Sequence, residues 1–229
     1  MDVSESALYE RAADCYLAAG MPAEAARCLR AAGAYRRSAE LWGELGLWSE
    51  AVTDFRSGQL VHQAAWTLVH ELGDPREARR LIRMVRPGEL EAHEARSAMV
   101  DDDYYPFAPD RFTVRDRLVL ARCDAAEGTG PDSLPPVLRA AANHLQDRRQ
   151  VFDRLVEDWA VTLAEQHRRY DQVALIYAAS LRGRRRNAAT RWRDWASRVL
   201  HAELTLPPVE PDRVRPVSGP VLDGARGRR

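Results

Sequence analysis

Residues 8–46 read LYERAADCYLAAG, MPAEAARCLRAAG and AYRRSAELWGELG, three consecutive 13-residue segments with the same order of residue types. Two adjacent small residues recur at this step, the first at Ala12, Ala25, Ser38, Ala51 and Ala64 and the second at Ala13, Ala26, Ala39, Val52, Ala65 and Ala78. A larger apolar residue follows each pair, at Tyr16, Leu29, Trp42, Phe55, Leu68 and Leu81. Six copies in register indicate a repeat architecture over residues 7–83.

The apolar positions inside one copy have the period of an α-helix. Tyr35, Ala39 and Trp42 are four and three residues apart, so they share one helical face. A 13-residue copy accommodates about ten helical residues and a turn of about three. A glycine closes most copies and fits the left-handed position after a helix, at Gly20, Gly33, Gly46, Gly58 and Gly73. The sequence therefore predicts an all-α, right-handed solenoid of short antiparallel helix hairpins over residues 1–83.

The rest of the chain has a different organisation. Residues 84–112 contain Pro87-Gly88 and a proline-rich aromatic segment, which predicts an ordered linker. Residues 113–204 carry apolar residues at helical spacing in longer runs, which predicts a helical block that continues the solenoid. Within it, Tyr170, Ala174 and Tyr177 repeat the spacing of Tyr35, Ala39 and Trp42. Residues 205–229 include five prolines and no apolar period, which predicts a flexible tail.

The first copies, Ala-Ala-x-x-Tyr-x-x-Ala-Gly followed by Ala-Ala-x-x-Leu-x-x-Ala-Gly, resemble the tetratricopeptide-like α-solenoid superfamily. The two-helix unit, Leu8–Gly33 in its first occurrence, is shorter than the tetratricopeptide repeat proper, which has about 34 residues. The segment is more similar to the compact repeats that follow β-propellers in intraflagellar-transport and vesicle-coat scaffolds, and to their bacterial relatives. This resemblance implies a scaffold or adaptor role and carries no catalytic residues with it.

Charge and composition exclude several chemistries. All 34 basic residues are arginine, which excludes lysine Schiff bases and lysine phosphate anchors and is typical of a bacterial genome rich in G and C. Residues 1–110 have a net charge of −7 and residues 111–229 a net charge of +7, so the halves either pack on each other or meet different partners. The acidic N-terminus and the lack of a long apolar run predict a cytoplasmic protein with no membrane contact.

Each candidate for catalysis or metal binding has a simpler explanation. The aspartates at 101–103 lack the alternation and glycine turn of a calcium loop, and a solvated acidic loop is favoured. The six histidines and three cysteines form no short metal-binding spacing. Neither a G-x-S-x-G nucleophile motif nor a P-loop is present. We therefore expect no enzymatic activity and no cofactor.

The expected function is that of a helical-repeat adaptor that presents exposed polar side chains to a protein partner. The candidate partner-binding residues are Arg36, Arg37, Glu44, Asp54 and Arg56 in the first block and Arg184, Arg185 and Arg186 in the second. One alternative is nucleic-acid binding by the arginines that surround Trp192 and Trp195, although at least one tryptophan is expected in the core. Another alternative is an accessory subunit of a bacterial ATPase or protease complex.

Overall fold

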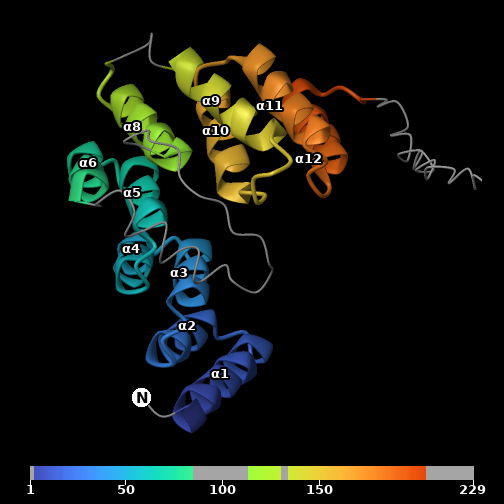
Figure 1. Cartoon of the computed structure of the whole chain (residues 1–229). Helices are drawn as coiled ribbons and strands as arrows, with labels where there is room; N and C mark the ends of the chain where they lie inside the picture. Colours follow the sequence, from blue (N-terminus) through green and yellow to red (C-terminus); the bar gives the residue numbers. More distant parts are fainter. Residues whose placement is uncertain (1–2, 85–112, 130–133, 205–229) are drawn as a thin grey trace, which may run out of the picture. The chain divides into compact units, whose positions relative to one another are not determined.

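The structure is a computed structural model that describes residues 3–84, 113–129 and 134–204. Within these ranges every regular element is a helix and no strand occurs. The repeat block comprises α1 (Val3–Ala18), α2 (Pro22–Ala31), α3 (Tyr35–Glu44), α4 (Trp48–Ser57), α5 (Val61–His70) and α6 (Pro75–Met84). The second block comprises α8 (Val114–Ala126), α9 (Leu134–Gln146), α10 (Arg154–Gln166) and α11 (Tyr170–Arg182) (Figure 1). Finally, α12 (Ala188–Trp195) continues into a π-helical turn, Ala196–Leu200. The predicted all-α class is confirmed.

The period of the repeat is visible in the helix boundaries. Helices α2, α3, α4 and α5 are equal in length and begin at Pro22, Tyr35, Trp48 and Val61, a constant step that equals the sequence period. The next helix, α6, begins one residue late, after Asp74, whose carboxylate accepts a hydrogen bond from the Glu77 amide at 3.0 Å. Each helix of the block packs against the next one in the chain, as a helical repeat requires. The right-handed winding and the antiparallel pairing stay predictions.

The left-handed turns follow the period more strictly than the glycines do. Positive φ angles of 65° to 78° occur at Gly20, Gly33, Gly46 and Gly73. The prediction for Gly58 is wrong, because its φ is −81° and Gln59, at the strict repeat step, has a φ of 59° instead. Gly58 has a different reason: a Cβ there would lie 2.9 Å from the Tyr35 Cβ. Close approach of Gly58 to the first residue of α3 therefore explains this glycine, and backbone conformation does not.

The two small residues of each copy face opposite neighbours. The second small residue of α1, Ala13, shares a buried cluster with the first of α2, Ala25. In the same way, the Ser38 hydroxyl of α3 lies 2.8 Å from the backbone carbonyl oxygen of Ala26 in α2. All four residues are fully buried. Small side chains thus allow neighbouring backbones to approach, while residues such as Leu29 fill the space between layers.

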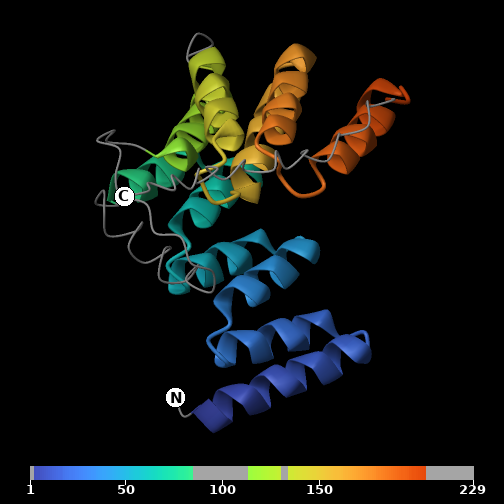
Figure 2. The ribbon, with the colours of Figure 1, turned by 45° about the vertical axis from the view of Figure 1, so that its right-hand side comes forward.

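The second block consists of longer helices, 13 residues each from α8 to α11. Helix α8 packs on α5 and α6 as well as on α9 and α10, so both blocks belong to one compact unit that ends at Ala188 (Figure 2). Helix α11 begins at Tyr170 after a left-handed residue, Arg168, with a φ of 53°, as α3 begins after Gly33. This local geometry agrees with a further repeat copy at Tyr170. The predicted linker and tail, residues 84–112 and 205–229, lie outside the described residues apart from Met84, which ends α6.

The chain from Ala189 onward is a second unit, of which the structure describes residues 189–204. It holds most of α12 and the π-helical turn. Trp195 is only 2 % exposed, whereas Trp192 is partly exposed. The expectation that at least one of these tryptophans is a core residue is confirmed.

Candidate protein-interaction surface

Helices α2, α4 and α6 share a charge pattern that links every second helix of the repeat block. Each has a glutamate at its third position and an arginine at its ninth: Glu24 and Arg30, Glu50 and Arg56, Glu77 and Arg83. The Arg30 Nη2 atom lies 2.6 Å from Glu50 Oε2, and Arg56 Nη1 lies 3.5 Å from Glu77 Oε1. We call these pairs the arginine–glutamate ladder. The earlier helix supplies the arginine and the helix two positions later supplies the carboxylate.

Asp54 does not belong to the surface, and its prediction as an exposed partner-binding residue is wrong. Its side chain is 1 % exposed and accepts a hydrogen bond from Arg30 Nε at 2.5 Å. The Ser38 hydroxyl lies 2.5 Å from the second carboxylate oxygen. Partial burial lowers the pKa of Arg30, but its hydrogen bonds to Asp54 and Glu50 raise this pKa above its ordinary value. A buried carboxylate needs such hydrogen-bond donors, so Asp54 of α4 connects α2 and α3 through buried hydrogen bonds to Arg30 and Ser38.

The other candidates of the first block remain at the surface. Arg37 reaches back to α1, with Nη2 at 3.3 Å from Asp14 Oδ1 and Nη1 at 3.7 Å from Glu10 Oε2. Ion pairs this exposed contribute between about 0 and 1 kcal/mol to stability, so Arg37 can leave the α1 carboxylates at little cost to bind a partner. Arg36 and Glu44 are exposed as well. The structure does not gather these residues with Arg56 into a single site.

Arg185, a candidate of the second block, has a structural role. Its guanidinium donates hydrogen bonds to the carbonyl oxygens of Leu145 at 2.8 Å, Asp147 at 2.6 Å and Gln150 at 2.8 Å. Burial lowers the pKa of this guanidinium. The neighbouring Gly183 is equally constrained, because a Cβ there would collide with the Leu145 carbonyl oxygen. The loop after α11 is therefore fixed against the C-terminal end of α9.

This attachment creates a basic surface that the sequence pattern did not predict. Arg184 and Arg186 are exposed, as predicted for candidate residues, and lie in the fixed loop. The loop after α9 adds two exposed arginines, Arg148 and Arg149, and Arg148 Nε donates to the Arg182 carbonyl oxygen at 3.1 Å. We call residues 147–150 and 182–186 the basic loop pair. Its two segments are separated in the sequence by α10 and by α11 up to Leu181, so only the fold brings them together.

Helix α1 presents several exposed or partly exposed apolar side chains on one helix face. Leu8, Tyr9, Ala12, Cys15 and Tyr16 follow one another at helical spacing, and we call them the open face of α1. Leu8 is 64 % exposed and Tyr9 and Tyr16 are each 37 % exposed. Sequence reasoning assigned Ala12 and Tyr16 to the repeat core and missed this surface. Among the described helices, α2 is the one that packs closely on α1, and it lies on one side of it (Figure 2).

Two positions of the open face, those of Ala12 and Tyr16, are mostly buried in later copies. Ala12 is partly exposed, whereas its counterparts are at most 1 % exposed, at Ala25, Ser38, Ala51 and Ala64. Tyr16 corresponds to Leu29, Trp42, Leu68 and Leu81, which are at most 7 % exposed, and to Phe55, which is partly buried. In each of these copies the preceding helix covers the position, as α1 covers Ala25. Leu8 differs, because its counterparts Met21 and Leu47 are also exposed, at 43 % and 47 %. At Ala12 and Tyr16, however, the open face has the composition of an internal helix interface.

A ring stack connects the two blocks where α5, α8 and α10 meet. The Trp66 and Trp159 rings are 4.7 Å apart at an interplanar angle of 6°, and His70 stacks on Trp66 at 5.3 Å. Arg122 Nε donates to His70 Nδ1 at 3.2 Å, and burial lowers the pKa of His70. The imidazole is therefore neutral at pH 7. Both tryptophans are buried, so the stack is a structural contact.

The described residues hold no group of three or more histidine, cysteine or acidic side chains that could bind a metal ion. The aspartates at 101–103 lie outside those residues. The three cysteines are free: Cys15 is exposed, Cys28 is partly buried and Cys123 is buried. Burial raises the pKa of Cys123 to about 11. Over residues 3–84, 113–129 and 134–204, no helix is long and apolar enough to cross a membrane.

No family model, curated protein or solved structure matches the chain. The repeat register, the exposed surfaces and the charges are therefore the basis for assigning a function.

Proposed function

We propose that this protein is a non-enzymatic helical-repeat adaptor that binds a protein partner through the open face of α1. The observation that carries the proposal is the exposure of Tyr16 and the partial exposure of Ala12, two positions that the later copies of the repeat mostly bury, beside exposed Leu8 and Tyr9. Exposed apolar groups that are contiguous on one helix are typical of interaction sites. Tyrosine in particular is enriched at interfaces because it combines apolar area with a hydroxyl group.

The resemblance to tetratricopeptide-like scaffolds supports the same function. We place the adaptor in the cytoplasm of a bacterium, where an ATPase or protease complex is one assembly that it could serve as a subunit. Exposed polar residues near the open face, such as Arg36 and Arg37, would then contribute to the rim of the interface.

Affinity capture tests the proposal. The tagged chain is expressed in its native host, captured with and without nuclease, and the bound proteins are identified by mass spectrometry. We expect a protein set that survives nuclease and is lost in the variant Tyr16→Glu. Leu175→Glu is the matched control, because Leu175 on α11 is also 37 % exposed but lies outside the open face. A bound set that is equal in the two variants would contradict the assignment of the site.

The basic loop pair favours nucleic-acid binding as a second candidate function. Exposed Arg148 and Arg149 extend the cluster around Arg184 and Arg186, and phosphate contacts by arginine provide sequence-independent affinity. Fluorescence anisotropy with a labelled single-stranded RNA and a DNA duplex, each at low and at high NaCl concentration, measures it. This function requires affinity that falls steeply with salt and is lost in the double variant Arg148→Glu, Arg149→Glu.

A further inference from the structure

We infer that the open face of α1 receives an amphipathic helix of the partner protein, which adds one more helix to the stack and places a basic residue of its last turn on Glu24. This inference rests on the proposed function and specifies the class of partner. Three observations carry it: the register of the small residues, the arginine–glutamate ladder and the covered far end of the repeat block.

The register of the small residues defines what fits on α1. Along the stack, the second small residue of one helix packs against the first small residue of the next, as Ala13 does on Ala25. Ala12 is the first small residue of α1, so the residue that would pack on it belongs to a preceding helix. Such a helix needs two adjacent small residues with an apolar residue three positions later, as α2 and α4 have. A larger pair would hold the backbones apart and leave Tyr9 and Tyr16 uncovered.

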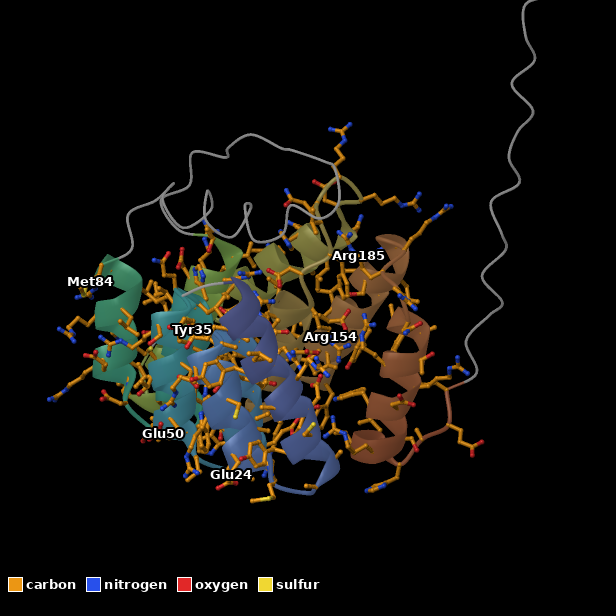
Figure 3. All side chains as sticks on the ribbon, turned by 90° about the horizontal axis from the view of Figure 1, so that it is seen from below. Glu24, Tyr35, Glu50, Met84, Arg154 and Arg185 are labelled. Atoms are coloured by element: carbon orange, nitrogen blue, oxygen red, sulfur yellow. The ribbon has the colours of Figure 1, made fainter. Side chains whose placement is uncertain are left out.

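The ladder defines the charge of that helix. Glu50 and Glu77 each accept an arginine from the helix two positions earlier, and Glu24 is the equivalent carboxylate of α2. For Glu24 the helix two positions earlier would be the one that covers α1. Glu24 now pairs with Arg27 of its own helix at 2.9 Å, and the two side chains are 37 % and 65 % exposed. Glu24 and Glu50 lie at the same edge of the molecule in Figure 3. A partner arginine or lysine at the ninth position would extend the ladder.

A second copy of this chain fits less well than a different protein. A head-to-tail copy would have to offer α6, but α6 already packs on α8. An α1-to-α1 contact would offer Leu17 at the ninth position of the repeat frame, which cannot pair with Glu24. Of these two occupants, a basic-ended amphipathic helix from another protein is the one that satisfies both the packing and the charge.

A tethered probe tests this docking mode without the unidentified partner. A copy of residues 47–60, which contains the whole of α4, is fused to the N-terminus of the full chain through a Gly/Ser linker of about 20 residues, which spans about 25 Å. Tethering gives an effective concentration of about 1 mM, which compensates for the weak binding of a single short helix. Cys15 lies on the open face and reports its coverage. Its alkylation rate is measured by mass spectrometry, with Cys28 as an internal reference.

We expect the probe to slow alkylation of Cys15 about tenfold relative to the linker alone, since about nine tenths of the molecules would be covered. Glu24→Arg should remove this protection, and Arg56→Glu in the probe copy should restore it in the Glu24→Arg chain. Circular dichroism checks that each variant is folded. Three results would overturn the inference: no protection of Cys15 by the probe, equal protection by a scrambled probe, or protection that neither charge reversal changes.

The outcomes separate this inference from the proposed function. If capture finds a partner that depends on Tyr16 but the probe does not protect Cys15, the adaptor stands and the docking mode is wrong. If the probe protects Cys15 but capture finds no protein, the docking mode stands and the proposed function fails. Light scattering of the unmodified chain adds a third measurement: a dimer that itself protects Cys15 would make the occupant a second copy and overturn the inference.

Discussion

Replacing Asp54 by asparagine tests the role of the most deeply buried carboxylate in the repeat block. The change keeps the size of the side chain but removes its charge and turns one acceptor into a donor. Asparagine can still accept from Arg30 or from Ser38, but its amide group then faces the other donor. Hydrogen bonds to charged groups contribute about 1.5 to 3 kcal/mol each, and the 1 % exposure of Asp54 leaves no route for water to replace them. We expect the unfolding free energy to fall by about 3 kcal/mol.

The matched control removes the other carboxylate that binds the same arginine. Glu50 is 49 % exposed, so Glu50→Gln should cost less than about 1 kcal/mol. Urea unfolding followed by far-ultraviolet circular dichroism at pH 7 compares both variants with the parent chain, and equal m-values would show that the unfolded states are comparable. The reasoning is refuted if the two variants lose the same free energy, because burial would then not distinguish the two carboxylates.

Two further predictions concern the turns and the thiols. Gly46→Ala should lower the unfolding free energy by about 1 kcal/mol because Gly46 has a φ of +71°; a Cβ there would meet nothing within 4 Å, so only the backbone conformation is strained. Gln59→Gly should raise the unfolding free energy by up to about 1 kcal/mol, because Gln59 adopts a left-handed φ of 59° that glycine tolerates better. Thermal melts measure both changes, and shifts of the same sign would contradict this account. In the folded chain, a disulfide reagent should modify Cys15 rapidly and Cys123 only after unfolding, because Cys123 is buried and its pKa is raised to about 11. Rapid native modification of all three thiols would be inconsistent with the buried position of Cys123.

The sequence was sufficient for the parts of the fold that depend on local repetition. A 13-residue period is a local signal, and it predicted the short helices that begin at Pro22, Tyr35 and Trp48. It failed where a contact between distant residues decides the outcome. Gly58 looked like a displaced cap, but the proximity of Tyr35 explains it, and Gln59 takes the left-handed conformation in its place.

The candidate site was harder to predict because exposure depends on what covers a residue. Asp54 and Arg56 are two positions apart and both read as surface charges, yet one is fully buried and the other is exposed. The charge of the two side chains does not distinguish them, since the difference in burial comes from α2 and α3 packing around Asp54. The stack of Trp66 on Trp159 has the same origin, because the two residues are far apart in the chain and lie in different blocks.

The division of charge between the halves of the chain was less informative than the order of charges along the helices. Residues 3–84 contain 10 arginines and 11 acidic residues, so the repeat block is nearly neutral and most of the acidic excess of the first half lies in residues 85–110. Helix α6 continues the internal pairing into the second block, since Arg79 Nη2 lies 2.5 Å from Asp124 Oδ1 and 2.9 Å from Glu127 Oε2. The packing of the two blocks therefore does not depend on attraction between opposite net charges. What distinguishes one charge from another is its place in the ladder. Glu24 is the first ladder carboxylate, and no described helix lies two positions before α2 to supply it with an arginine.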